Sequence, residues 1–430
     1  MKVLKFKEKD FFSKLYFYTS KREKLINKDI DFLVGNIIND VKKNGDSALV
    51  KYTKKLDNIN FSNKNIKLIN HSRYYSNKLI DRRVITSFKK AIKNITDFHK
   101  KQLPKNYEVR KNQVRLISQW QPMESVGLYI PGGRASYPSS LLMTAIPAIV
   151  AGVKRIVCVT PPVKKINPYI VKLLEELKIH EVYFVGGAQA IAALAYGTKT
   201  IKPVNKIFGP GNAYVTSAKK QVFGKVGIDL IAGPSEIVVV ANEKNNPKWV
   251  ASDLMAQAEH DENAQSILIT NSKKFSNAVQ KEIIKISKNI KKTNILTKSL
   301  NRNGLVVLIE NFNYAADIIN YIGPEHLHIH LKNYKKILSN IRNAGAIFIG
   351  EFTTEAFGDY IVGTNHVLPT FGSSKFSSGL GVIDFMKRKS IIEMNKISFD
   401  NYANDVKKMA EVEGLEAHKL SVKIRQTNKN

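Results

Sequence analysis

Residues 126–159 read VGLYIPGGRASYPSSLLMTAIPAIVAGVKRIVCV. Two short apolar runs, GLYI at 127–130 and RIVCV at 155–159, have the length of β-strands, and a helix-sized apolar stretch separates them. A turn rich in glycine and proline, IPGG, ends the first run. Strands that alternate with helix-sized spacers are typical of an open parallel sheet covered by helices.

The same alternation continues along the chain. Apolar runs of strand length recur as EVYFV (181–185), NKIF (205–208), EIVVV (236–240), QSILIT (265–270), LVVLI (305–309), HLHIHL (326–331) and AIFIG (346–350). Helix-sized spacers separate most of them, for example at 168–178 and 247–260. The pattern predicts an α/β protein with parallel sheets. We expect ligands beyond the carboxyl ends of the strands, where the turns VGG (185–187), GPGN (209–212) and AGPS (232–235) fall.

No turn carries a complete dinucleotide-binding fingerprint. GPGNAYV has two glycines of the G-x-G-x-x-G pattern, but Tyr214 stands where the third glycine belongs. A purely structural turn explains such a partial match as well as a bound nucleotide does. The spacing alone therefore indicates an α/β protein whose turns suit phosphate, and it indicates no particular cofactor.

Length and composition restrict the class of protein. A chain of 430 residues with 43% hydrophobic content is expected to form two or more globular domains. Its single cysteine, Cys158, excludes an internal disulfide and a cysteine-rich metal site. No apolar run reaches the ~20 residues needed to cross a bilayer, and MKVLKFKEKDFF has no apolar signal core. We therefore expect a cytoplasmic protein with no membrane partner.

The net charge of +32 raises the alternative of a nucleic-acid-binding protein. However, the lysines are scattered along the whole chain, and no interleaved aromatic residues suggest base stacking. The densest stretch, 271–292, reads as an amphipathic helix with Val279, Ile283, Ile286 and Ile290 on one face. We expect no nucleic-acid partner; binding that weakens steeply with salt and needs no metal would favour this alternative.

Polar side chains that could hold a metal ion occur in three segments. Gln257 and His260 lie three positions apart on a predicted helix, so they share one face. The other two segments are the glycine-rich AFGDYIVGTNHVLPTFG (356–372), with Asp359 and His366, and EVEGLEAHK (411–419), with Glu413 and His418. Imidazoles and a carboxylate from separate segments suit Zn²⁺ or Mn²⁺.

The segment IGPEHLHIHL (322–331) supplies a candidate acid–base pair, Glu325 and His326. A carboxylate beside an imidazole offers two groups that exchange protons near neutral pH. His326, His328 and His330 alternate and would face one way on a strand, which suggests a three-histidine metal site. Their side chains would be ~7 Å apart, too far for one ion. We expect His328 and His330 to cover a sheet face.

Eight blocks resemble, in order and spacing, the signature blocks of the histidinol dehydrogenase family. They are VGLYIPGGRASYPSS, VGGAQAIAALAYGT, FGPGNAYVTSAKKQV, DLIAGPSEIVVVA, ASDLMAQAEHDENAQ, GPEHL, FGDYIVGTNHVLPT and EGLEAHK, and the resemblance runs from about residue 25 to the C-terminus. It implies a four-electron oxidation of L-histidinol through L-histidinal to L-histidine, the last step of histidine biosynthesis. Two NAD⁺ and one water are consumed.

The resemblance also implies roles for individual residues of this chain. The metal, Zn²⁺ with Mn²⁺ as a substitute, would be held by Gln257, His260, Asp359 and His418, and Glu325 and His326 would be the catalytic pair. NAD would contact Tyr129, Gln189 and Asn212. The substrate would contact the metal ligands and His326, together with Ser235 and Glu413, and His366 would line its pocket. His328 and His330 depart from the family, which is not usually rich in histidine there.

The architecture that the resemblance implies is two incomplete Rossmann-like, doubly wound domains, one inserted in the other, in a homodimer with shared active sites. The expected boundaries are an N-terminal extension at 1–22, a discontinuous domain at 23–128 and 236–378, an inserted domain at 129–235, and a C-terminal helical segment at 379–430 that is exchanged between subunits. Two alternatives remain: a related metal- and NAD-dependent dehydrogenase acting on another alcohol, and a zinc hydrolase without nicotinamide.

Overall fold

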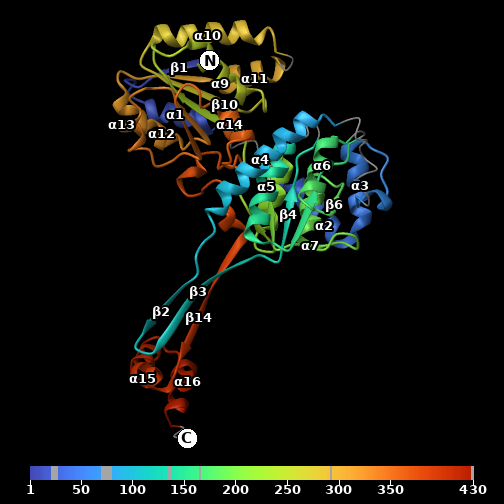
Figure 1. The fold of residues 1–430 in the computed structure, drawn as a ribbon, viewed down its shortest axis with the longest axis vertical. Coiled ribbons are helices and arrows are strands. Elements are labelled where there is room, and N and C mark those ends of the chain that lie inside the picture. Colours follow the sequence, from blue (N-terminus) through green and yellow to red (C-terminus); the bar gives the residue numbers. More distant parts are fainter. Residues whose placement is uncertain (21–27, 69–79, 133–136, 164–165, 291–292, 428–430) are drawn as a thin grey trace. The chain divides into compact units, whose positions relative to one another are not determined.

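The computed structural model describes residues 1–20, 28–68, 80–132, 137–163, 166–290 and 293–427. The chain divides into two compact units, Met1–Gln102 with Met123–Phe385, and Leu103–Pro122 with Met386–Asn430 (Figure 1). Parallel sheets and helices in the first unit confirm the predicted α/β class. Within the described ranges, no helix combines the length and apolar character that a bilayer crossing requires.

A six-stranded, all-parallel sheet forms one half of the first unit, in the order β1-β11-β10-β9-β12-β13. Every residue of β9 and β10 is buried, as expected where helices cover both faces of a parallel sheet. The strands are β1 (Lys2–Lys5), β9 (Glu236–Val240), β10 (Gln265–Thr270), β11 (Leu305–Leu308), β12 (His326–Ile329) and β13 (Ala346–Ile349).

Helices pack on both faces of this sheet. Ile237 and Val239 point to the face covered by α9 (Pro247–Ala258), α10 (Lys273–Ser287) and α11 (Thr293–Asn303). Val238 and Val240 point to the face covered by α1 (Phe11–Ser20), α12 (Ala315–Ile322) and α13 (Lys335–Leu338). Helix α10 is the amphipathic helix predicted within 271–292: it buries its apolar side, including Val279.

A five-stranded parallel sheet forms the other half, in the order β6-β5-β4-β7-β8. The strands are β4 (Ser125–Tyr129), β5 (Arg155–Val159), β6 (Glu181–Tyr183), β7 (Lys206–Phe208) and β8 (Gly227–Ile228). The connecting helices are α5 (Pro138–Ala151), α6 (Pro168–Glu176), α7 (Gly187–Tyr196) and α8 (Ala213–Val222). All nine apolar runs expected as strands from the sequence contribute a strand to one of the two sheets.

Three N-terminal helices pack beside the five-stranded sheet. They are α2 (Lys28–Asn44), which packs on α7 and α8, α3 (Asp46–Asp57), which packs on α7, and α4 (Arg82–Lys100), which packs on α5. The sequence-based division grouped 23–128 with 236–378 and treated 1–22 as an extension. In the structure β1 of that extension is an edge strand of the six-stranded sheet, and both sheets belong to one compact unit. The inserted-domain boundaries remain a prediction.

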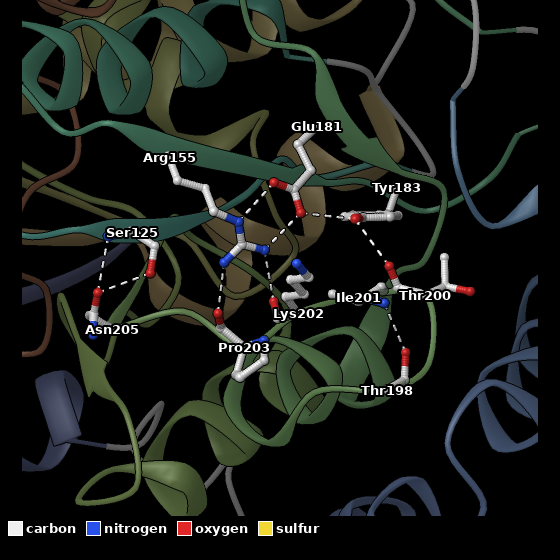
Figure 2. A network of polar contacts seen from close by, with 10 residues as sticks. All are labelled: Ser125, Arg155, Glu181, Tyr183, Thr198, Thr200, Ile201, Lys202, Pro203 and Asn205. Carbon is white, nitrogen blue, oxygen red and sulfur yellow. Dashed lines mark hydrogen bonds and ion pairs between the residues drawn. The ribbon is translucent and has the colours of Figure 1, made fainter.

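At the amino ends of three neighbouring strands in the five-stranded sheet, side chains form hydrogen bonds with one another and with nearby loop residues (Figure 2). Ser125, Arg155 and Glu181 are the first residues of β4, β5 and β6. Arg155 Nε and Nη2 donate to the two carboxylate oxygens of Glu181 at 2.8 and 2.7 Å. The same guanidinium donates to the carbonyls of Lys202 and Pro203 at 2.9 and 2.7 Å. This edge of the sheet is thereby tied to the loop before β7.

The second unit is small and contains an antiparallel sheet, in the order β14-β3-β2. Its elements are β2 (Tyr107–Lys111), β3 (Val114–Pro122), β14 (Met386–Met394), α15 (Lys396–Val412) and α16 (Glu416–Thr427). The segment 379–430 was predicted to be helical, but within this unit it starts with the nine-residue strand β14 before its two helices. Many apolar side chains here are exposed, among them Ile392, Met409 and Val412.

Short helical turns complete the described elements. Helix α14 (Glu355–Tyr360) follows β13, and four 3-10 turns span Asn63–Asn65, Phe312–Tyr314, Ser373–Lys375 and Val382–Phe385.

Candidate active site

Glu325 and His326 lie at the amino end of β12, beside the first residue of β9. Glu325 Oε2 accepts a hydrogen bond from the Glu236 amide at 2.8 Å, and His326 Nδ1 donates to the Glu236 carbonyl at 3.1 Å. Only 6% of Glu325 and 3% of His326 is exposed. The expectation that ligand-binding groups lie at carboxyl ends is therefore wrong for this pair. The parallel β9–β12 pairing brings the two amino ends together.

The imidazole of His326 has one nitrogen fixed and one nitrogen available. Because a carbonyl can only accept, Nδ1 carries a proton, and Nε2 is directed towards Asp359 Oδ1 at 3.7 Å. No hydrogen bond engages Nε2 in the part of the chain that the structure describes. A buried imidazole with a fixed orientation and an open nitrogen can transfer a proton to or from a bound molecule.

Burial and neighbouring charges shift the pKa values of this pair. Burial raises the pKa of Glu325 to about 7, although the His326 charge and the Glu236 amide oppose the shift. Burial alone would lower the pKa of His326, but the Glu325 charge and the Asp359 carboxylate beside Nε2 raise it to about 10. Glu325 therefore exchanges protons near neutral pH. His326 keeps both of its ring protons there until a positive charge beside the carboxylates lowers its pKa.

A further carboxylate, Glu355, lies in the same cluster and escaped the sequence analysis. It is the first residue of α14, is 2% exposed, and burial raises its pKa well above the usual range. With the Gln257 amide turned so that its nitrogen faces Glu355, that nitrogen donates to both carboxylate oxygens at 3.1 Å. One signal was present: Glu355 precedes Asp359 by four residues, the spacing that places two side chains on one helix face.

The predicted metal ligands of the first unit fall around this cluster. Gln257 is buried near the end of α9, and His260 is exposed in the turn directly after it. Burial would raise the pKa of Asp359, but the His326 imidazole beside it and the charges of His366 and His260 lower it. His366 Nδ1 donates to the Asp359 carbonyl at 3.0 Å. The structure thus brings Asp359 and His366 together, as the glycine-rich segment suggested.

The remaining predicted substrate-site residues are Ser235 in the first unit, and Glu413 and His418 in the second unit. Ser235 is half-buried and directly precedes β9, one position from Glu236. Glu413 directly follows α15 and His418 lies in α16, and both are exposed in the second compact unit. The cluster of the first unit is built without them.

The predicted cofactor residues lie at or after the carboxyl ends of β4, β6 and β7 in the five-stranded sheet, where β5 separates β6 from β4. Tyr129 ends β4, and its hydroxyl accepts from the Gly187 amide at 3.2 Å; burial raises its pKa to about 12. Gln189 lies in α7 after β6, is 1% exposed, and its Oε1 has no hydrogen-bond partner in the described ranges. Asn212 follows β7 and caps α8, accepting from the amides of residues 214 and 215 at 3.1 Å.

The GPGN turn after β7 is held in one conformation. Gly209 has a φ of 110°, and a Cβ there would lie 2.2 Å from the Tyr129 carbonyl oxygen, so the position requires glycine. Asp229 Oδ2 accepts from the Gly209 amide at 2.7 Å, and Lys219 Nζ donates to the Gly209 carbonyl at 3.0 Å. Lys219 and Asp229 also form a buried ion pair. A fixed glycine turn at a helix N-terminus suits a phosphate group.

The residues of the cluster fit a divalent cation. Glu325, Glu355 and Asp359 are three carboxylates that face one imidazole, an excess of negative charge that is unfavourable when buried. Because the nitrogen of the Gln257 amide bonds to Glu355, the oxygen of this amide points away from that carboxylate. Amide oxygen, carboxylate and imidazole form a mixed ligand set that transition metals accept.

Parallel sheets with a rigid glycine turn at one edge, and a buried acid–base pair at another, define an α/β enzyme. The family model for histidinol dehydrogenase matches residues 20–426. Histidinol dehydrogenase of Rhizobium meliloti (strain 1021) is 46% identical over 421 residues, 97% of this chain and 96% of that protein. The enzyme of Aquifex aeolicus (strain VF5) is 42% identical, over 96% of each chain.

A crystal structure of histidinol dehydrogenase from Elizabethkingia anophelis superposes with a TM-score of 0.92. The two are 33% identical in sequence, and the match covers 99% of this chain and 98% of the other. The chain belongs to the histidinol dehydrogenase family.

Proposed function

We propose that this chain oxidises L-histidinol through L-histidinal to L-histidine with NAD⁺, in the cytoplasm. The observation that carries the proposal is the buried Glu325–His326 pair, in a chain whose family membership extends over nearly its whole length. The family's name supplies the substrate class, and the geometry supplies the groups that the two oxidations need.

The first oxidation requires removal of the hydroxyl proton as a hydride leaves the carbon. His326 would serve as the base through Nε2, because Nδ1 is already committed to the Glu236 carbonyl. This role requires a bound cation that offsets the carboxylates, since these hold the pKa of His326 at about 10. The second oxidation requires water to add to the aldehyde. Glu325, whose pKa lies about 7, is the group that deprotonates this water.

Gln257, His260 and Asp359 of one chain, with His418, would hold one metal ion, Zn²⁺ or in its place Mn²⁺. When bound, the ion would supply positive charge that orients the substrate and offsets the buried carboxylates. Substrate would contact these ligands and His326, Ser235 and Glu413. Glu355 holds the Gln257 amide in the orientation that leaves its oxygen for the ion.

NAD would bind across the carboxyl edge of the five-stranded sheet, in contact with Tyr129, Gln189 and Asn212. The unpartnered Gln189 Oε1 can accept a hydrogen bond from the cofactor, and the amino end of α8 suits its pyrophosphate. Lys219 and Asp229 hold the glycine turn before α8 in the conformation that this binding would use.

The working molecule is a homodimer in which Glu413 and His418 serve the partner's site. The second unit supports this proposal because it buries little of its own apolar surface: Val412 is 89% exposed and Ile392 68%. A unit with so small a core is expected to be stabilised by another surface.

The dimer is tested by mixing two inactive variants, His326→Ala and His418→Ala. Random re-pairing gives half mixed dimers, each with one site that carries both defects and one intact site, so about a quarter of wild-type activity should return. If mixed dimers form and no activity returns, each site belongs to a single chain.

The activity is tested by incubating the pure protein with histidinol and NAD⁺ and counting NADH per histidine. Two equivalents are expected; one equivalent with accumulating aldehyde would indicate a simple alcohol dehydrogenase. Comparable turnover of an amino alcohol that lacks imidazole would point to the alternative substrate. Hydrolysis without NADH would indicate a zinc hydrolase.

A further inference from the structure

Three buried side chains gather on the face of the six-stranded sheet that α9 covers. His328 lies in β12, His330 follows that strand, and Asp253 lies in the middle of α9. Both histidine side chains have 0% exposure and the Asp253 side chain 5%. One ligand atom from each residue lies within 4.8 Å of the other two. His326 shares the strand and the face, but none of the three belongs to the acid–base cluster.

The spacing of these atoms approaches that of a metal site. Asp253 Oδ2 is 3.2 Å from His328 Nδ1 and 2.8 Å from His330 Nε2. In a tetrahedral zinc site with bonds of ~2.0–2.2 Å, neighbouring ligand atoms are roughly 3.3–3.5 Å apart. Small side-chain rotations would therefore open the group around an ion.

One ring nitrogen of His328, Nδ1, faces the Asp253 carboxylate without forming a hydrogen bond in the described ranges. The ring's Nε2 donates to the Gly350 carbonyl at 2.9 Å, and its Nδ1 faces the Asp253 carboxylate at 3.2 Å. Without a proton on Nδ1, two lone pairs would face each other there. Two lone pairs facing each other in a buried place repel. A cation between them would remove the repulsion, and the Gly350 bond is the outer contact that metal-binding histidines usually make.

We propose that Asp253, His328 and His330 form a second divalent-cation site, separate from the one at Gln257, His260 and Asp359. Two imidazoles and one carboxylate suit Zn²⁺ or Co²⁺ better than Ca²⁺ or Mg²⁺, which take oxygen ligands. The site is closed to solvent, so its ion is structural. It ties α9 to β12, the strand that carries His326.

Metal content of the whole protein tests the site independently of activity. The protein is stripped with a chelator, reloaded with Co²⁺, dialysed, and analysed for cobalt per chain and for visible absorption. Wild type should hold two equivalents. His330→Gln should hold one, His260→Ala should hold one, and the double variant none. His180→Gln, at an exposed histidine far along the sequence, is the matched control and should hold two.

Thermal unfolding supplies a second readout. Zn²⁺ should raise the melting temperature of stripped His260→Ala, but not that of the double variant. Asp253→Asn, of nearly equal volume, takes the place of His330→Gln if that variant fails to fold. Equal cobalt content in wild type and in a folded His330→Gln or Asp253→Asn would overturn the proposal and leave a charged hydrogen-bonded network. One equivalent in wild type that persists in His260→Ala and is lost in His330→Gln would support this site and contradict the catalytic one.

Discussion

The amino ends of the two parallel sheets carry similar side chains in different states. In the five-stranded sheet, Arg155 and Glu181 satisfy each other and two loop carbonyls (Figure 2). In the six-stranded sheet, Glu325 and His326 are more deeply buried, yet His326 Nε2 has no hydrogen bond in the described structure. Polar groups that all have hydrogen-bond partners contribute stability, whereas a buried polar atom without one can bind a ligand.

The carboxyl ends reverse this pattern. Those of the five-stranded sheet carry the exposed cap Asn212 and the buried Gln189 oxygen, which has no hydrogen-bond partner among the described residues. Those of the six-stranded sheet are filled: the amide of Asn245, after β9, donates to Glu351 at 2.9 Å and to the His330 carbonyl at 3.1 Å. If the proposed sites are correct, each sheet has one edge for structure and one for function, and the two sheets use opposite edges.

Metal removal should have the largest effect. It should affect the proposed site on the six-stranded sheet and leave the proposed cofactor site on the five-stranded sheet unchanged. A chelator is expected to abolish turnover, because the carboxylates around His326 lose their counter-charge, and Zn²⁺ or Mn²⁺ should restore it. NAD⁺ affinity, followed by fluorescence titration, should change little, since the proposed cofactor site is on the five-stranded sheet. Full turnover by a demonstrably metal-free sample would contradict the proposed metal role.

Substitutions at the functional edge of the six-stranded sheet come next. His326→Asn should slow both oxidations by about 10²–10⁴-fold, the usual contribution of a positioned acid–base group. Glu325→Gln should slow oxidation of supplied histidinal more than oxidation of histidinol to the aldehyde, measured by single-turnover NADH formation. Equal losses at the two steps in Glu325→Gln would remove its separate role as the base for water.

The paired edge of the five-stranded sheet should respond in stability, not in catalysis. Arg155→Met leaves Glu181 and two carbonyls without their donor, and we expect a loss of about 2–3 kcal/mol in the free energy of unfolding. Urea titration measures this loss, and kcat of the folded variant should stay near the wild-type value. Lys389→Met, at an exposed position of β14, is the surface control. A kcat that falls with stability intact would show that this edge also serves the reaction.

Asn212 caps α8 and is also a proposed NAD contact. We expect its substitution to have the smallest effect, and two variants can separate its contribution to stability from its contribution to cofactor binding. Asn212→Ala removes the cap of α8 and should cost about 1 kcal/mol of stability and raise KM for NAD⁺. Asn212→Asp keeps the cap but adds negative charge where pyrophosphate would bind, so stability should be kept while KM rises. An unchanged KM in the Asp variant would separate α8 from the cofactor.

The sequence predicted the two sheets well because buried parallel strands are continuous apolar runs that need no partner to be recognised. It failed for β2 and β14, whose residues are largely exposed, and for β3, which is mostly half-buried. The pairing of β3 with β14 also joins positions almost 300 residues apart, as for Val114 and Met394. Strand β1 is only four residues long, and β8 only two, so neither carries a readable period.

The candidate site was predicted in part. Asp359 and His366 stood out because polar residues in a glycine-rich segment are conspicuous, and Glu325 and His326 because they are adjacent. Glu355 was missed because a single glutamate before such a segment resembles an ordinary surface residue until its burial is known. The partnership of Asp253 with His328 and His330 depends on how α9 crosses the sheet, which no local pattern specifies.

The order of strands sets the order in which the two sheets can be completed during synthesis. The five-stranded sheet is drawn from one continuous stretch, so it can close soon after residue 228 has left the ribosome. The edge strand β1 pairs with β11, from Lys2 with Leu305 to Lys5 with Leu308. At ~5–20 residues per second, its hydrogen-bonding groups wait roughly 15–60 s for that partner. During this interval the nascent chain offers an unpaired strand edge that a chaperone could shield.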